Sequence, residues 1–295
     1  MKLLTKFTLV FSVLCGSGLL LAAALGYRFL QDNAREEVLR EANLLRSAAL
    51  ASRDYTSKQI RPLLEKQPEH QAEFLPQSMP PFGATETFAY LRLQHPEYTY
   101  KEAALNPTNP RDRAADWEAD LINVFRTHRA IRQLTGERDT PTGRALYLAH
   151  PIVAEMACLE CHGTPERAPT ALVRRYGPSN GFGWNAGDVV AAQIVTVPMS
   201  IPESTANRAF RNLLLYLAGV FVLTVMVLDA VVVFTVTRPA TLLAAMADEI
   251  SQGNLDIPDL PVPSKDEISI LATSFNRMRR SMVKAMRMLE KQRPL

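Results

Sequence analysis

The sequence predicts an α+β domain between two membrane-spanning helices, followed by a helical coiled coil. Two long apolar runs, near residues 7–27 and 213–236, predict the membrane helices. The segment between them combines stretches of helical periodicity with stretches rich in β-branched residues, which indicates an α+β domain. Beyond the second run, apolar residues recur at alternating steps of three and four, the spacing typical of a coiled coil.

The overall composition is that of a folded protein with little net charge. The 295 residues are 47% hydrophobic and 21% charged, with a formal net charge of +3. Because the charge is small and no basic stripe alternates with aromatics, we expect no nucleic-acid partner. The length allows one or two domains besides the membrane segments.

The first apolar run, residues 7–27, contains no charged residue. It is long enough to cross a bilayer core of about 30 Å. Lys2 and Lys6 precede it, so the positive-inside rule assigns residues 1–6 to the cytoplasm. A cleaved signal peptide is the alternative, because alanines 22–24 offer a cleavage site for small residues.

The second apolar run, residues 213–236, is followed by Arg238 and a basic C-terminal segment. That end is therefore also expected in the cytoplasm, which leaves residues 28–212 in the periplasm of a bacterial inner membrane. The chain would be a multi-pass protein. Asp229 lies within this run and either tunes a helix interface or lies near enough to one end to be hydrated.

Residues 158–162 read Cys-Leu-Glu-Cys-His, the motif of covalent haem attachment. Thiols three residues apart can form thioethers to both haem vinyl groups, and the adjacent His is the proximal iron ligand. We therefore expect one haem c, bound through Cys158 and Cys161 with its iron on His162. A zinc site would need two further ligands, and a thioredoxin-like redox pair would not require the trailing His.

The sequence leaves the sixth iron ligand open. Water or an empty position would suit a sensor, whereas a strong His or Met ligand would suit electron transfer. The histidine and methionine options in the segment between the apolar runs are His70, His95, His128, His150, Met79, Met156 and Met199.

Local patterns predict the elements of this segment. Residues 34–66 read as a helix that continues out of the first apolar run. Prolines punctuate residues 75–112, so loops and short elements are expected there. The remaining predictions are a helix over 114–132, strands over 144–154 and 189–197, and a glycine-rich loop over 176–187 that is suited to lie against a flat ring.

Three separated runs, residues 98–110, 158–165 and 176–184, resemble a bacterial family of haem-bearing periplasmic sensor domains. That family is largely catalogued as a domain of unknown function, and it has a PAS-like fold. The resemblance covers residues 35–200 and implies a five-stranded antiparallel sheet with flanking helices and a haem on one face. In some soluble relatives a Cys on the first helix is the distal ligand, but this sequence has no Cys there.

Further residues are candidates for the haem or ligand pocket. Cationic and phenolic side chains suit the anionic haem propionates or a small ligand, although each is equally a surface charge or a packed ring. The candidates are Arg53, Tyr55, Lys101, Arg111, Tyr176 and Trp184.

Residues 237–290 resemble a HAMP linker, the four-helix module that joins membrane sensors to outputs, and residues 291–295 form a tail. Pro239, a connector over 253–263 and the run Asp266-Glu267-Ile268 carry the resemblance. The heptad positions of the two helices predict a homodimer; the alternative is an amphipathic helix on the inner leaflet. These positions are Leu243, Met246 and Ile250, then Ile268, Leu271, Phe275, Met278, Met282, Ala285 and Leu289.

Together these features predict a transmembrane receptor. The haem would sense redox state, a diatomic gas or another small ligand, and the HAMP segment would relay the signal. The chain ends at Leu295, without room for a kinase or cyclase, so we expect no enzymatic activity and a separate cytoplasmic signalling partner. A membrane-anchored electron-transfer cytochrome is the main alternative, and a haem peroxidase is a third.

Overall fold

The structure, a computed structural model, describes residues 3–261 and 266–291. It divides into two units. Arg28–Ala209 form the first, here called the α+β unit. Met1–Tyr27 together with Phe210–Leu295 form the second, here called the helical unit.

The long helix expected at the start of the α+β unit is present. Helix α1 spans Leu3–Tyr55 without a break, so it continues out of the first apolar run as predicted. A π-helical turn, Thr56–Ile60, and the short helix α2, Arg61–Leu64, extend it. The region is rich in Ala, Leu, Glu and Arg and has no Pro before Pro62, which favours an uninterrupted helix.

The sheet of this unit has four antiparallel strands in the order β1-β4-β3-β2. The strands are β1 (Thr99–Ala104), β2 (Leu134–Thr140), β3 (Gly143–Val153) and β4 (Val189–Pro198). All residues of the inner strand β4 are buried, as expected for a β-branched run covered on both faces. A bulge interrupts the β3–β4 register between Ile152 and Val153.

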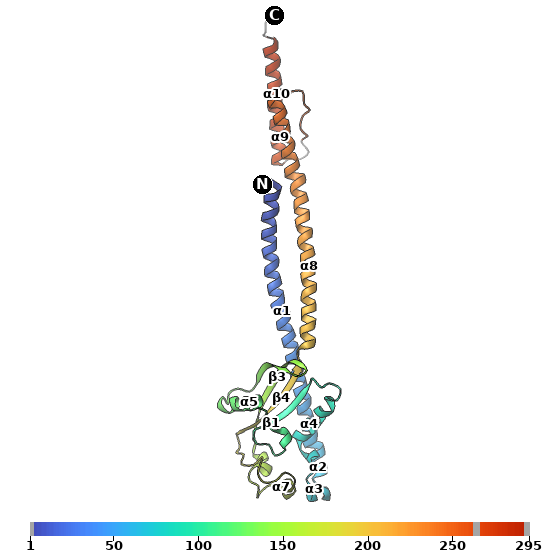
Figure 1. The fold of residues 1–295 in the computed structure, drawn as a ribbon, viewed down its shortest axis with the longest axis vertical. Helices are drawn as coiled ribbons and strands as arrows, with labels where there is room; N and C mark the ends of the chain where they lie inside the picture. Colours follow the sequence, from blue (N-terminus) through green and yellow to red (C-terminus); the bar gives the residue numbers. More distant parts are fainter. Residues whose placement is uncertain (1–2, 262–265, 292–295) are drawn as a thin grey trace. The chain divides into compact units, whose positions relative to one another are not determined.

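Helices cover both faces of the sheet (Figure 1). On one face, α1 and α4 (Pro80–Leu91) pack through Val38, Ala42 and Phe88 onto side chains such as Leu148 and Val195. On the other face, helix α5, Asp116–Thr127, packs through its apolar stripe. Its core residues are Leu121, Ile122 and Phe125.

Several predictions for this unit were incomplete. The resemblance implied five strands, but the described residues form four. Within residues 75–112, α4 begins at two prolines that occupy its first turn, where a missing N–H is tolerated. Strand β2 escaped prediction because its sequence, LTGERDT, is polar, which an edge strand allows. The helix expected over 114–132 ends at Thr127.

The short helices of the α+β unit lie outside this layered core. They are α3 (Pro68–Ala72), α6 (Leu159–His162) and α7 (Thr170–Tyr176), with 3-10 turns at Pro76–Ser78, Pro110–Asp112 and Met156–Cys158.

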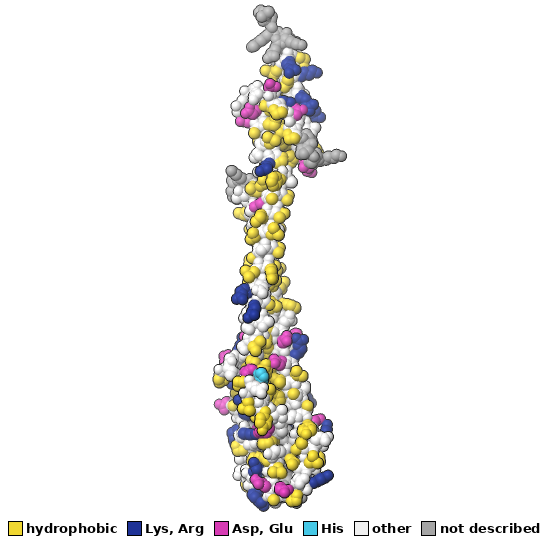
Figure 2. All heavy atoms as spheres, turned by 90° about the vertical axis from the view of Figure 1, so that its right-hand side faces the viewer, with side chains coloured by type: hydrophobic (Ala, Val, Ile, Leu, Met, Phe, Trp, Pro, Cys, Tyr) yellow, Lys and Arg dark blue, Asp and Glu magenta, His cyan; other side chains and the backbone are white. Residues whose placement is uncertain are grey.

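In the helical unit, both apolar runs are helical and their side chains are largely exposed (Figure 2). Helix α8 spans Ser200–Val232, followed by a π-helical turn at Val233–Thr237. Windows in this helix and in α1 reach a mean hydropathy of 2.6 and 2.2, enough by length and composition to cross a membrane. Thr8 Oγ1 donates a hydrogen bond of 2.6 Å to Asp229 Oδ1, which favours the helix-interface interpretation of that acid.

The HAMP segment contains α9, Arg238–Ser251, and α10, Glu267–Lys291. Leu243 packs with Ala272 and Phe275, and Leu260 of the connector completes this small core. The Asn276 amide holds the connector, because its Oδ1 accepts from the Leu260 N–H at 2.8 Å and its Nδ2 donates to the Leu260 carbonyl at 2.9 Å. Leu271, Met278 and Met282 are exposed in the single chain, and the side chain of Leu289 lies outside the described residues.

Candidate functional site

The Cys-Leu-Glu-Cys-His motif occupies a single compact turn. Cys158 ends a 3-10 turn, and α6 follows directly with Cys161 and His162. Both thiols are free and half-buried. The Glu155 N–H donates to Cys158 Sγ at 3.4 Å. The two cysteines therefore lie three residues apart in consecutive short turns, and both thiols are available for covalent chemistry.

His162 is oriented by a backbone carbonyl. Its Nδ1 lies 2.7 Å from the Gly181 carbonyl oxygen, so Nδ1 carries the proton and donates. The other ring nitrogen, Nε2, then keeps its lone pair for a metal, the arrangement by which proteins fix an imidazole ligand. Burial lowers the pKa of His162, and the bond to Gly181 offsets this only in part, which favours the neutral ring.

Trp184 packs flat on the same imidazole. The two ring centroids are 4.0 Å apart and the planes differ by 10°. Backbone bonds fix this arrangement, from the Gly183 N–H to the Gly163 carbonyl at 2.7 Å and from the Trp184 N–H to the His162 carbonyl at 3.2 Å. The glycine-rich loop therefore joins the motif through main-chain hydrogen bonds.

Gly181 must be glycine for this loop to approach. Its φ of +79° lies in the left-handed region, and an added Cβ would come within 1.9 Å of Thr108 Oγ1. Thr108 also lies 3.4 Å from His162 Nδ1. The segment after β1, the glycine-rich loop and α6 thus converge on His162.

Cys161 has a cationic neighbour from the extended first helix. Burial raises the pKa of the Cys161 thiol, and the charge of Arg61 opposes that rise. Arg61 also pairs with Glu65 at 2.6 Å. Sequence reasoning missed Arg61, Thr108 and Gly181. The π-helical turn before Arg61 and the close loop contact at Gly181 are three-dimensional features that local patterns do not reveal.

A second polar cluster surrounds Arg53, one of the predicted pocket residues. Its Nη1 pairs with Glu102, and the Tyr100 hydroxyl donates to the same carboxylate at 2.7 Å. Burial alone would lower the pKa of Arg53, but the charge and hydrogen bond of Glu102 raise it overall. Nearby, burial raises the pKa of Asp112 to about 6; Arg111 opposes this shift and Glu102 adds to it.

The remaining predicted pocket residues are dispersed. Tyr55 is 60% exposed. Lys101 Nζ bonds Glu118 at 2.6 Å and the Arg113 carbonyl at 2.7 Å. Arg111 pairs with Glu86 and lies over the Phe82 ring, while Tyr176 packs edge-on against Phe74. Of the six candidates, Trp184 alone makes a described contact with His162, so the role of the others stays a prediction.

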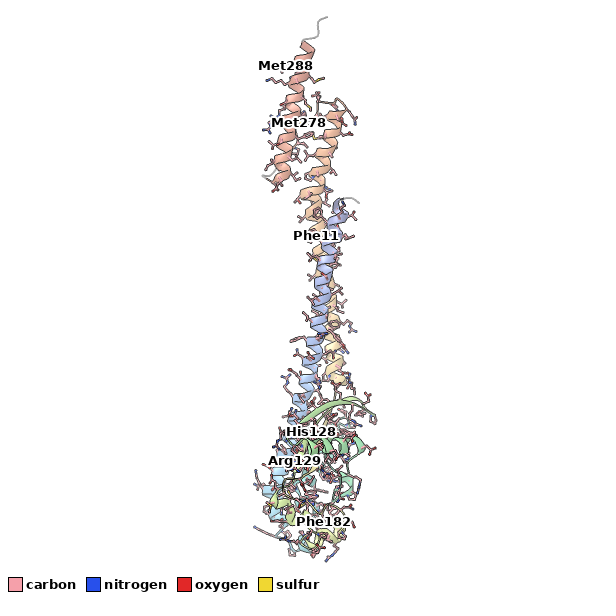
Figure 3. The ribbon with its side chains drawn as sticks, turned by 90° about the vertical axis from the view of Figure 1, so that its left-hand side faces the viewer. Phe11, His128, Arg129, Phe182, Met278 and Met288 are labelled. Atoms are coloured by element: carbon pink, nitrogen blue, oxygen red, sulfur yellow. The ribbon has the colours of Figure 1, made fainter. Side chains whose placement is uncertain are left out.

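The options for a sixth ligand have different surroundings. His150 on β3 has a buried Nε2 without a hydrogen-bond partner among the described residues, and burial lowers the pKa of its ring. Met199 is buried in the sheet core, and Met156 is 72% exposed. Met79 packs against the cluster that contains Phe74. His95 Nδ1 lies 3.6 Å from Glu97 Oε1. His128, labelled in Figure 3, follows α5 at an exposed position. The side chain of His70 lies outside the described residues.

Two protein families match parts of this chain. The Tll0287-like family matches residues 31–198, and the HAMP domain matches residues 231–284. A solved structure, the crystal structure of the cyanobacterial heme-protein Tll0287, aligns at 15% identity over 55% of this chain and 93% of that one, with a TM-score of 0.39. No curated protein matches this chain.

The two matched families and the two apolar helices together indicate a membrane-anchored signalling protein. The first match covers more than half of the chain. The chain therefore belongs to the Tll0287-like family, and its Tll0287-like domain is followed by a HAMP domain.

Proposed function

We propose that this chain is a transmembrane receptor that senses redox state or a small ligand through one covalent haem c. The observation that carries the proposal is the orientation of His162. The bond between its Nδ1 and the Gly181 carbonyl leaves Nε2 as a ligand, on the same turn as two free thiols. This donor set fits a c-type haem, and the name of the solved relative, a heme-protein, supports it.

Three residues of this chain would hold the haem. Cys158 and Cys161 would supply the thioethers, and His162 the axial nitrogen. The bound haem would supply a one-electron redox centre and an iron that binds gases. Trp184 covers one face of the imidazole, so it would exclude water from that face and restrict rotation of the ring.

The proposed topology assigns residues 28–212, which contain the PAS-like α+β unit, to the periplasm of a bacterial inner membrane. Residues 7–27 and 213–236 would cross it, with the HAMP segment and both termini in the cytoplasm. Haem c is attached outside the cytoplasm, so motif and topology agree. The exposed seam of α10, including Met278 and Met282, supports a homodimer that signals to a separate cytoplasmic protein.

Haem attachment is tested by purifying the full chain from a host that matures c-type cytochromes. We expect Soret absorbance that survives acid–acetone extraction. The double variant Cys158→Ser/Cys161→Ser should lose it, whereas Cys15→Ser, which changes the remaining thiol, should keep it. Wild-type protein without covalent haem would end the proposal.

Signalling is tested on the same protein with spin labels on α10. Distances across the dimer are compared between ferric, ferrous and carbon monoxide-bound forms. A sensor should change at least one distance distribution, because the ligand state must bias a two-state element. Identical distances in all three forms, with rapid reduction by quinol, would favour the electron-transfer alternative.

A further inference from the structure

A cavity of about 420 Å³ lies beside Trp184 in the α+β unit. The end of α5, the segment after β1, the glycine-rich loop and the start of β4 border this cavity, which is open to solvent on the side of the exposed Arg126 and Arg129. Figure 3 labels two of its residues, Arg129 after α5 and Phe182 in the glycine-rich loop. Its lining includes Asn106, Arg126, Arg129, Phe182, Trp184 and Asp188.

Two guanidinium groups line this cavity without an acidic partner. Arg53, Arg111 and Arg144 of the same unit each pair with a glutamate. In the described part of the chain, no carboxylate lies within ion-pair distance of Arg126 or Arg129. Arg126 Nε donates to the Val189 carbonyl at 2.9 Å, which leaves its terminal nitrogens for another acceptor. Two unpaired guanidiniums in one cavity favour an anion.

The other walls restrict the kind of anion. Phe182 and Trp184 offer aromatic surface, and Asn106 offers an amide. Asp188 is the one acid of the lining, and its Oδ2 already accepts from the N–H and Nδ2 of Asn185, each at 3.1 Å. Its negative charge disfavours a dianion such as phosphate. A carboxylate on an apolar or aromatic body matches this combination of walls.

We propose that the Arg126–Arg129 cavity binds a carboxylate. Two sources share that chemistry: a free organic acid and a propionate of the haem, the second of which rests on the proposed function. In both cases the occupant would lie against Trp184, whose ring is stacked on His162. Occupancy would therefore act on the proposed iron ligand through one aromatic contact.

The test uses the full chain in detergent and sodium benzoate as the probe. Benzoate binding is measured by isothermal titration, and the haem midpoint potential by a spectroelectrochemical titration. The variants are Arg129→Gln and the double variant Arg126→Gln/Arg129→Gln. Arg92→Gln, an exposed arginine outside the cavity, is the matched control. Arg129 is exposed and makes no described side-chain hydrogen bond, so its single variant should fold even if the double variant does not.

A free acid as the natural occupant predicts saturable benzoate binding that weakens at least tenfold in the cavity variants and is unchanged in Arg92→Gln. A haem propionate predicts no benzoate binding and a lower midpoint potential in the cavity variants, because lost positive charge favours the ferric state. The proposal is overturned if benzoate binding is absent or unchanged in the cavity variants and the midpoint potential is also unchanged in them. Haem content, measured by absorbance, reports separately on the proposed function, and the benzoate titration remains decisive in protein without haem.

Discussion

The two units of this chain bury their apolar residues in different ways. In the α+β unit, helices cover both faces of the sheet and all of β4 is buried. In the HAMP segment, Leu243, Leu260 and Ala272 form one small buried cluster. Large apolar side chains along α10 stay exposed, among them Leu271, Met278 and Met282.

This difference shows which unit buries its apolar side chains within a single chain. The α+β unit contains within itself the side chains that close its core. The HAMP segment leaves an apolar seam on α10 uncovered within the single chain, and exposed apolar stripes of this length mark an interaction surface.

The largest effect is expected in the sheet core. Phe125 of α5 is 1% exposed, so Phe125→Ala should lower the free energy of unfolding of the α+β unit by about 3–5 kcal/mol. The measurement is urea denaturation of the full chain in detergent, with unfolding monitored by tryptophan fluorescence. Tyr90→Ala removes an aromatic ring that is 71% exposed and should change it by less than about 0.5 kcal/mol. Equal losses would contradict a core closed within one chain.

A second test changes the loop that orients His162. Gly181→Ala places a Cβ at positive φ and against Thr108, which should cost about 2–3 kcal/mol. Gly177 has a similar φ of +80° but open space around its added Cβ, so Gly177→Ala carries the strain without the clash.

The two variants are compared by urea denaturation and by the absorbance spectrum of the proposed haem in the purified protein. We expect Gly181→Ala to be the less stable and to change the spectrum, whereas Gly177→Ala should keep it. Identical spectra in both variants would mean that the Gly181 carbonyl does not determine the orientation of the imidazole.

The sequence singled out Cys158, Cys161 and His162 as a candidate site because covalent haem attachment uses residues that are neighbours in sequence; their role as haem ligands stays a prediction. Trp184 was found through its glycine-rich loop, and the structure brings it to His162. Thr108 and Gly181 were missed because their contact with His162 depends on two loops that are distant in sequence.

Secondary structure was predictable where periodicity is strong. The apolar runs, α1 and β4 follow from long helical or β-branched patterns. Strand β2 lacks apolar alternation because it lies at the edge of the sheet, so its pairing with β3 decides its conformation. Helix α4 was not predicted because its prolines indicated loops, although a helix accepts proline in its first turn.

The third test addresses the small core of the HAMP segment. Asn276 is 4% exposed and satisfies both backbone groups of Leu260. Asn276→Ala leaves two buried main-chain groups unpaired, which should cost about 1–2 kcal/mol locally. Hydrogen exchange in residues 254–261 should accelerate while the α+β unit is unchanged. Asn254→Ala, which loses an exposed bond to Glu249, is the control, and equal acceleration in both variants would refute the role of Asn276.

The fourth test uses the acid whose environment opposes ionisation. Burial raises the pKa of Asp112 from an ordinary 3.8 to about 6. The folded state therefore binds a proton more tightly than the unfolded state, and this residue's contribution to stability is lost as pH rises from about 4 to about 6. Asp112→Asn should stabilise the α+β unit by about 1 kcal/mol at pH 7, after allowance for solvent screening.

The measurement for Asp112→Asn is urea denaturation at about pH 3 and at pH 7. The gain should be present at pH 7 and nearly absent at about pH 3, below both pKa values, where the acid is mostly protonated in both states. Asp139→Asn, at an exposed position on β2, is the control. A gain of equal size at both pH values would contradict the assigned cause.

The smallest effect on the fold of the chain is expected at the seam of α10. Met282 is 44% exposed, so Met282→Ala should change the stability of a single chain by less than about 0.5 kcal/mol. If another copy covers the seam, the same variant should weaken the dimer, because the removed side chain occupies a core position of the coiled coil.

Ile270→Ala is the control, because it removes an apolar side chain that is 61% exposed and lies off the seam. Cross-linking yields and sedimentation in detergent should fall for Met282→Ala and stay constant for Ile270→Ala. Equal yields in both variants would mean that the seam is covered by something other than a second copy, such as the bilayer surface.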